Sequence, residues 1–508
     1  MNLGFVDIAF FIAFLILVWT VSFWASRKEE TSEDYFLAGR DLKWWLIGIS
    51  LIASNISTEH FVGMAGRGFE LGLAIASYEW MAAVTLVLVA IFFLPKFLKS
   101  GIYTIPEFLE YRYNSTSRTI MAVFILIMYV FVALSSILYS GALAFASIFD
   151  LHLTMVIWFI GISVGVYTIY GGLKAVVVSD MIQGITLLLG GVIITVLGFK
   201  EIGGVARFFE IAHDKLHTVL PHDHPEMPWV AVFIGGLWIP NIFYWGLNQF
   251  ITQRTLAAKS LTEGQKGILL SAFIKLIIPF IIVFPGIMAY ELYGNEIANG
   301  DTAYPYLIKN ILPTGLRGLM FAALFGAVMS SVDSLLNSAS TIFSMDIYKK
   351  YINIEAGTKQ LVKVGRITTA ILVIFGCLWA PFIGDFKNVF EYIQKFQGFI
   401  SPGIVSVFVM GIIWKKVPSS AAIAAMLFNI PVYGILLWLL PDIAFLHHMM
   451  ITFLVLVAII ALITLAAPLK EVKTFPVVSN FDDTTPAGIK YLSVLLIAVT
   501  AVLYYIFR

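Results

Sequence analysis

Apolar runs of roughly 20 residues recur along the whole chain, and this repetition constrains the fold more than any other feature. Each run is long enough to cross the roughly 30 Å hydrocarbon core of a bilayer as a helix. About fourteen runs can be counted, centred near residues 16, 55, 87, 132, 161, 187, 242, 279, 330, 371, 401, 428, 456 and 498. Backbone groups in the bilayer find no water, so a helix is the spanning structure that this hydropathy allows. The sequence predicts an all-α polytopic membrane protein with about 14 transmembrane helices.

The composition supports a membrane protein and excludes several other classes. Of the 508 residues, 60% are hydrophobic and 12% are charged, whereas a soluble domain is near half apolar and a quarter charged. The formal net charge is +1 and no long basic tract is present, which argues against nucleic-acid binding. A single cysteine leaves no disulfide framework and no thiolate metal site. No nucleophile–base pair with a recognisable spacing is found either, so no enzymatic activity and no organic cofactor are expected.

The distribution of positive charge predicts the orientation. The first apolar run is followed, not preceded, by Arg27 and Lys28, which is the reverse of a cleavable signal peptide. With the N-terminus outside, 22 of the 32 lysines and arginines fall in inner loops and 8 in outer loops. This asymmetry agrees with the positive-inside rule. The prediction is a multi-pass protein of a cell membrane, a bacterial inner membrane, with its N-terminus outside.

Two of the predicted spans contain helix-breaking sequence near the middle of the membrane. The second span carries the polar octet Ala53–His60, and the seventh carries Gly235–Asn241 with Pro240. Irregular backbone within a bilayer persists only where protein or a watery cavity satisfies it. Because the two breaks are five spans apart, the second copy of such a repeat would insert upside down, as in inverted-repeat transporters. The alternative is a pair of helices in which glycine and serine weaken the helix and serve only close packing.

Ionisable and polar residues inside the spans indicate a binding site. A charge at the bilayer centre costs several kcal/mol, so an ionisable residue there usually has a function. The candidates mix hydrogen-bond donors with acceptors and lie in spans that also carry aromatic residues. Polyhydroxylated solutes need many directional hydrogen bonds and a flat aromatic surface. The polar candidates are Asn55, His60, Glu79, Asn241, Lys275 and Gln394, and the aromatic ones are Tyr78, Tyr244 and Phe390. The alternative for any one of them is a pairing that only fixes helix packing.

A second pattern suits a small cation. Ala327, Ser330, Ser331 and Ser334 fall at i, i+3, i+4 and i+7, which is one stripe of a helix. Facing the unwound carbonyls near residues 53 and 56, this stripe would offer several oxygens without a full negative charge. A hard cation that must bind and then leave needs such a site.

At these positions the sequence resembles the sodium/solute symporter family, specifically its sodium–glucose cotransporter branch. The matching runs follow the family's order over about 370 residues with compatible spacing, and together they are specific although each is short. They are YFLAGR (35–40), ASNIS (53–57), ASYEW (76–80), YGGL (170–173), QRTLA (253–257), MSS (329–331), NSAST (337–341), MDIY (345–348) and SPG (401–403).

The resemblance implies a five-plus-five inverted repeat working by alternating access. The expected organisation is an extra span and inner loop (1–43), a first repeat (44–198), an outer loop (199–229), a second repeat (230–414) and C-terminal extra spans (415–508). Substrate contacts would be Asn55, His60, Glu79, Asn241, Lys275 and Gln394, with Tyr244 as inner gate and Met64, Tyr78 and Phe390 as outer lid. Sodium would bind the carbonyls of Ala53, Ile56 and Ala327 and the hydroxyls of Ser330 and Ser331. A second sodium site would use Asp180, Asp333 and Ser334, with proton coupling as a variant.

The expected function is sodium-coupled import of a glucose- or galactose-like monosaccharide, with sodium as coupling ion and no obligate protein partner. His60 resembles the animal glucose transporters, whereas similar bacterial galactose carriers have glutamine there. Ala82 and Ala133 depart from polar residues of relatives, which leaves the epimer preference open. The alternatives are a symporter for myo-inositol or another polyol-type solute and a weakly coupled, sodium-conducting sugar sensor.

Overall fold

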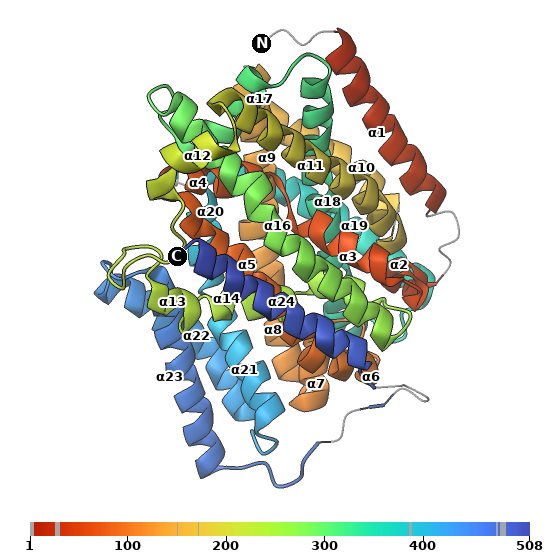
Figure 1. The fold of residues 1–508 in the computed structure, drawn as a ribbon. Coiled ribbons are helices and arrows are strands. Elements are labelled where there is room, and N and C mark those ends of the chain that lie inside the picture. Colours follow the sequence, from red (N-terminus) through yellow and green to blue (C-terminus); the bar gives the residue numbers. More distant parts are fainter. Residues whose placement is uncertain are drawn as a thin grey trace.

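The protein is described by a computed structural model covering residues 5–25, 31–149, 151–170, 172–385, 389–473, 476–477 and 484–508. Within these ranges the chain is a bundle of helices, and its extended pairing is limited to two isolated bridges, Leu42 with Ala258 and Leu220 with Pro228 (Figure 1). The all-α prediction is therefore confirmed for the described residues. Arg27, Lys28 and Gly171, used in the sequence argument, lie outside them.

The helices of the first half are α1 (Phe5–Ala25), α2 (Ser32–Leu37), α3 (Trp44–Asn55), α4 (Ala65–Leu71), α5 (Ser77–Leu88), α6 (Leu94–Ser100), α7 (Ile105–Arg112), α8 (Ser115–Met128), α9 (Ser135–Phe149), α10 (Leu153–Tyr170), α11 (Leu173–Ile202) and α12 (Val205–Ile211). Those of the second half are α13 (Trp229–Phe233), α14 (Trp238–Ile242), α15 (Gln249–Leu256), α16 (Leu261–Tyr293), α17 (Ala303–Ile311), α18 (Leu316–Ile342), α19 (Thr358–Trp379), α20 (Val389–Gln397), α21 (Ser401–Ile413), α22 (Ser419–Leu439), α23 (Phe445–Ala466) and α24 (Ala487–Ile506). Wider π-helical turns join some of them into longer rods, at η2 (Glu59–Met64), η4 (Val89–Phe93), η5 (Tyr129–Leu134), η7 (Phe243–Leu247) and η9 (Phe343–Ile352).

Eleven helical segments of the described chain are long and apolar enough to cross a membrane. Three shorter apolar helices accompany them, at Trp44–Asn55, Leu153–Val166 and Ser401–Ile413. This confirms a polytopic membrane protein, while the count of fourteen spans stays a prediction.

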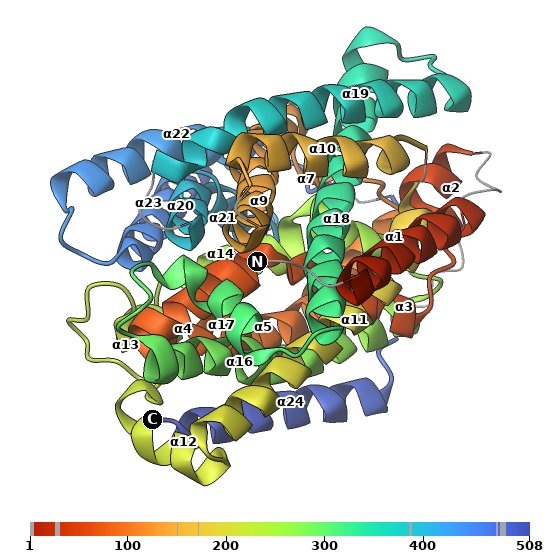
Figure 2. The same ribbon diagram turned by 90° about the horizontal axis from the view of Figure 1, so that it is seen from above.

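Burial identifies the centre of the bundle. The most apolar stretch of the segment Leu316–Ile352, which contains α18, is 94% buried, whereas those of α1 and α24 are 22% buried. Figure 2 shows α18 running through the bundle with α1 beside it at the edge. The Asp7 carboxylate of α1 accepts hydrogen bonds from the backbone N–H groups of Gly315 (2.7 Å) and Gly318 (2.9 Å). These N–H groups lie at the N-terminus of α18, where the first N–H groups of a helix have no partner within the helix.

The first predicted break is confirmed. Helix α3 ends at Asn55, and Ile56 has φ −78° and ψ 93°, which is outside the helical region. The rod resumes with the π-helical turn at Glu59 and continues into α4. Carbonyls at the C-terminal end of a helix lack intrahelical partners, so this break exposes acceptors inside the protein.

The second predicted break is also confirmed, and it is followed by another that the sequence did not indicate. Helix α13 ends at Phe233 and α14 begins at Trp238. A side chain at Gly236 would collide with the backbone of Leu446, so this close approach requires glycine. The rod then opens again at Asn248, which has φ −90° and ψ 119° and caps α15 by accepting from the N–H of Phe250 (3.3 Å).

Candidate functional site

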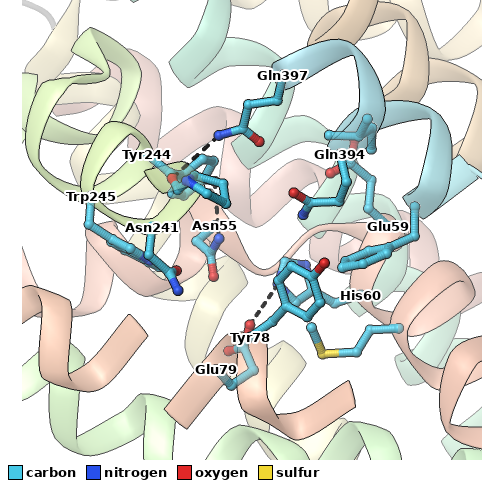
Figure 3. A pocket seen from close by; sticks show the side chains of 14 residues that line it. Asn55, Glu59, His60, Tyr78, Glu79, Asn241, Tyr244, Trp245, Gln394 and Gln397 are labelled. Carbon is cyan, nitrogen blue, oxygen red and sulfur yellow. Dashed lines mark hydrogen bonds and ion pairs between the residues drawn. The ribbon is translucent and has the colours of Figure 1, made fainter. Parts of the chain in front are cut away.

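A polar pocket lies where the two broken rods meet, between η2, α5, α14, η7 and α20. The volume of this cavity is about 90 Å³. Figure 3 shows Trp245 and Asn241 on one side and Gln394 and Glu59 on the other. The lining residues are Asn55, Glu59, His60, Met64, Tyr78, Glu79, Pro240, Asn241, Tyr244, Trp245, Phe390, Ile393, Gln394 and Gln397.

A charged pair supports one wall of the pocket. Lys275 of α16 is fully buried, and its ammonium donates to the carboxylate of Glu79 and to the side-chain oxygen of Asn55. The other carboxylate oxygen of Glu79 lies 3.5 Å from Nε2 of His60. The ammonium of Lys275 also lies 4.9 Å from the ring centre of Trp245. A buried charge is tolerated when it is paired and hydrogen-bonded, and Lys275 meets both conditions.

Aromatic residues close the pocket at two places. The side-chain amide of Asn55 donates to the hydroxyl of Tyr244 (3.0 Å), which holds that ring beside the end of α3. The rings of Tyr78 and Phe390 meet edge to face with their centres 4.9 Å apart, and the buried Met64 lies against the same pocket. All four predicted gate residues therefore line the pocket, and their roles as gates stay a prediction.

Several buried polar atoms of the pocket have no hydrogen-bond partner within the described chain. They are Oε1 of Gln394, Nδ2 of Asn241, Oε1 of Glu59 and Nδ1 of His60. A buried polar atom without a partner costs about 1–3 kcal/mol. All four atoms belong to residues that line the same small pocket, and they include the acceptors of Gln394 and Glu59 and the donor of Asn241. Such a set suits a ligand that both donates and accepts hydrogen bonds.

The structure brings together the predicted substrate residues, with one difference in placement. Asn55, His60, Glu79, Asn241 and Gln394 line the pocket, whereas Lys275 lies behind Glu79 and Asn55. The pocket is also lined by Glu59, Trp245 and Gln397, which were not among the predicted substrate contacts or gates. Their positions offered a signal, because each is next to a predicted residue or three positions along the same helix.

The predicted cation stripe faces the end of α3. The hydroxyl of Ser331 donates to the carbonyl of Ser54 (3.1 Å), which fixes α18 against the break. Ala53, Ile56, Ala327, Ser330 and Ser331 are all buried. These residues would supply carbonyl and hydroxyl oxygens, the ligands that hard cations prefer.

Next to this stripe, the carboxylate of Asp180 in α11 accepts hydrogen bonds from four donors. They are the hydroxyls of Ser50 (2.5 Å), Ser54 (3.1 Å) and Ser330 (2.5 Å) and the guanidinium of Arg254 (3.0 Å). The two charged side chains, Asp180 and Arg254, are both fully buried.

Ser334 joins this network and connects it to Asp333. The hydroxyl of Ser334 accepts from Arg254 and lies 3.2 Å from Oδ1 of Asp333. Asp180 and Ser334 therefore share Arg254 as a donor, and both contact Ser330. Arg254 belongs to the matching run 253–257 and was also counted among the basic residues of the inner loops. The structure instead places it fully buried in α15, where it is the cation that Asp180 holds.

One catalytic-type pattern is explained by its structural context. Residues 161–165 read Gly-Ile-Ser-Val-Gly, which has the spacing of the nucleophile elbow of serine hydrolases. That motif needs a sharp strand-to-helix turn, whereas these residues lie inside α10. The pattern is part of a membrane-spanning helix.

A bundle of apolar helices with a polar pocket at two broken rods defines a membrane transporter. The pattern of the sodium:solute symporter family matches residues 35–428. The sodium/glucose cotransporter of Vibrio parahaemolyticus is 43% identical over 523 residues, covering 97% of this chain and 94% of that protein. Human sodium/myo-inositol cotransporter 2 is 34% identical over 457 residues, covering 82% of this chain and 67% of that protein.

A solved structure has the same fold. A Na⁺-coupled sialic acid symporter, in a substrate-bound outward-open state, superposes with a TM-score of 0.84 at 24% identity, covering 93% of this chain and 100% of that one. The chain belongs to the sodium:solute symporter family. Members of this family are transporters and not enzymes, and sodium is their coupling ion.

Proposed function

We propose that this symporter imports a glucose- or galactose-like monosaccharide by alternating access, together with sodium. The observation that carries the proposal is the set of unpartnered donors and acceptors on Gln394, Asn241, Glu59 and His60, enclosed by aromatic rings. Sugar hydroxyls both donate and accept, and the apolar face of a sugar ring packs on an aromatic residue. The similarity to sodium/glucose cotransporters supports this substrate class.

A polyol such as myo-inositol is the second candidate. It offers the same alternation of hydroxyl donors and acceptors, and relatives named as myo-inositol cotransporters are 33–34% identical. Both solutes satisfy the unpartnered atoms, so the choice depends on a competition experiment.

For sodium we propose the carbonyls of Ala53, Ile56 and Ala327 with the hydroxyls of Ser330 and Ser331. The break after Asn55 supports this site, because it frees carbonyls of α3 beside the hydroxyl stripe of α18. A second ion would bind Asp180, Asp333 and Ser334, where it would compete with the guanidinium of Arg254.

We further propose the arrangement in the membrane that the charge distribution favours, with the N-terminus outside a bacterial inner membrane. Two inverted repeats, near 44–198 and 230–414, would place the two broken rods at equivalent positions. Rocking of one repeat against the other would then expose the pocket alternately to each side. The lipid bilayer, the solute and sodium are the partners that this mechanism needs.

The proposal is tested by uptake of radiolabelled sugar into proteoliposomes. We expect uptake of glucose or galactose when sodium is outside, and loss of that uptake when choline replaces sodium. Unlabelled glucose, galactose and myo-inositol as competitors identify the solute that the pocket prefers. Equal uptake in choline would refute sodium coupling, and competition by myo-inositol alone would select the second candidate.

The sodium site makes a further prediction. Ser331→Ala removes one of five proposed oxygens from a site without a compensating carboxylate among them. A hydrogen bond or ligand oxygen facing a charge contributes about 1.5–3 kcal/mol, so the sodium concentration for half-maximal transport should rise roughly tenfold or more. The matched control is Ser340→Ala on the same helix, whose hydroxyl donates to the carbonyl of Asn337 (2.9 Å). An unchanged sodium dependence in Ser331→Ala would place the ion elsewhere.

A further inference from the structure

Aromatic rings from three helices meet behind the wall of the transport pocket. Trp80 comes from α5, Phe280 from α16 and Tyr504 from α24, and Phe507 directly follows α24. We call these four residues the aromatic cluster. Figure 1 shows α24 running alongside α5 and α16, the two helices that carry the charged pair of the pocket. The cluster therefore joins α24, which lies outside both proposed repeats, to the pocket wall.

Trp80 lies at the centre of the aromatic cluster. Its side chain is fully buried, and the ring centres of Tyr504, Phe507 and Phe280 lie 5.2 Å, 6.1 Å and 6.2 Å from its own. The ring of Tyr504 meets it edge to face at 86°, and the other two are tilted by 39° and 45°. Edge-to-face and offset pairs at such distances are favourable. The rings carried by α24 therefore help to fix the position of Trp80.

Trp80 contacts both helices that supply the charged pair. It follows Glu79 in α5, and its indole Nε1 donates to the carbonyl of Leu276 in α16 (3.3 Å), the residue after Lys275. The carboxylate of Glu79 and the ammonium of Lys275 form their ion pair between the same two helices. A displacement of Trp80 therefore changes the separation of α5 and α16 at the level of this pair.

Phe507 is held in place by contacts on two sides. Its carbonyl accepts hydrogen bonds from the N–H and the hydroxyl of Thr218 (2.7 Å each), in the loop after α12. Its ring is stacked on Phe209 of α12, with the centres 6.4 Å apart and the planes at 22°. The same ring lies 6.1 Å from Phe280 and 6.4 Å from Phe284 of α16. These contacts fix the end of α24 against α16.

We propose that α24 is a positioning element for solute binding: its aromatic rings hold Trp80, and Trp80 holds Glu79 and Lys275 at the separation that binds the solute. Binding groups must be kept within roughly 0.5 Å of their productive geometry by the residues that support them. The inference rests on the proposed function, because the solute is the ligand that the pair positions. The pocket thus depends on a helix that is not part of the repeats forming it.

The test measures sugar binding to the full chain in detergent by calorimetric titration in saturating sodium, with glucose and galactose as the probes. Phe507→Ala removes one ring from Trp80, and we expect binding to weaken about tenfold. Phe507→Tyr keeps the ring and should restore the wild-type affinity. The matched control is Tyr491→Ala, which removes a ring that is 76% exposed on the same helix and should bind as the wild type does.

A double-mutant cycle separates positioning from a general loss of packing. The loss caused by Phe507→Ala should nearly vanish in a Glu79→Gln background, where the ion pair is already absent. It should persist in a Gln394→Ala background, because Gln394 belongs to α20 on another wall of the pocket. Wild-type affinity in Phe507→Ala, or an equal loss in both backgrounds, would overturn the proposal. If Phe507→Ala does not fold, Phe507→Leu removes the ring while keeping apolar volume and replaces it throughout.

Thermal unfolding without sugar gives a second readout of the same cycle. We expect the destabilisations by Phe507→Ala and Glu79→Gln to be non-additive, and those by Phe507→Ala and Gln394→Ala to be additive. A wild type that binds neither sugar would contradict the proposed function alone, and the unfolding cycle would still decide whether α24 positions the pair. Additive destabilisation in both cycles would overturn the positioning role.

Discussion

Removing Glu79 should abolish sugar binding, and we expect this to be among the largest effects of any single substitution in the pocket. Glu79→Ala deletes the carboxylate that pairs with Lys275 and faces His60. Breaking a buried ion pair by removing one partner costs about 3–5 kcal/mol, because the other charge stays buried and unpaired. The substitution therefore affects folding as well as the site, a coupling that the sequence did not show.

Gln394→Ala separates the two effects. Among the residues that the structure describes, the buried side-chain oxygen of Gln394 has no hydrogen-bond partner, so its removal leaves none of their donors unpaired. The sugar hydroxyl that it would bind then loses its partner, which costs about 1–3 kcal/mol and weakens binding by roughly 5- to 150-fold. Calorimetric titration with sugar in sodium measures this loss, and thermal unfolding in detergent checks the fold.

Two further variants sharpen the comparison. Glu79→Gln keeps the size and an acceptor oxygen beside Lys275, so it should retain more stability than Glu79→Ala while still binding sugar weakly. Gln360→Ala replaces an exposed glutamine that does not line the pocket, and it should leave the sugar affinity unchanged. Wild-type sugar affinity in both Gln394→Ala and Glu79→Gln would refute the assignment of the pocket.

The sequence predicts those parts of the fold and site that depend on local patterns. The breaks after Asn55 and at Gly235–Gly236 follow from polar or glycine-rich runs within apolar segments, and both are present. The interruption at Asn248 was not predicted, although Gly246 stands two residues before it. It depends instead on the contact of Asn248 with Tyr129, a residue of a distant segment.

Long-range pairing is the part that the sequence alone did not reveal. Lys275 was predicted as a direct substrate contact, but whether it lines the pocket or stands behind it depends on how α16 packs against α5 and α3. In the same way, Arg254 and Asp180 are separated by 74 residues, and neither residue's own surroundings in the sequence indicate the other. The resemblance identified the residue types, and the tertiary packing determines their partners.

The pairing of Asp180 with Arg254 bears directly on how many sodium ions accompany each sugar. Arg254 is one of four donors to Asp180, and it also donates to Ser334. A second sodium at Asp180, Asp333 and Ser334 would therefore have to displace the guanidinium. Because both are monovalent cations, the exchange would keep the carboxylate neutralised when the site empties. The alternative is that Asp180 serves only to hold Arg254.

The number of ions has a large effect on accumulation. At about 100 mV one charge contributes roughly 2.3 kcal/mol, and a tenfold sodium gradient adds about 1.4 kcal/mol. One ion can then concentrate sugar by roughly 500-fold, whereas two can do so by about 2.5 × 10⁵-fold. A second site would suit uptake from very dilute sugar.

We expect reversal potentials measured in proteoliposomes to give two charges per sugar for the wild type and one for Asp333→Ala. The loss of one ion would lower the limiting accumulation by roughly 500-fold at the same gradients. Asp333 is the residue to change, because replacing Asp180 would leave Arg254 buried without its carboxylate, a cost of about 3–5 kcal/mol that would obscure the result. The matched control is Asp442→Ala, an exposed aspartate between α22 and α23, which should leave the ratio at two. A ratio of one in the wild type that Asp333→Ala does not alter would exclude the second ion and leave Asp180 as the anchor of Arg254.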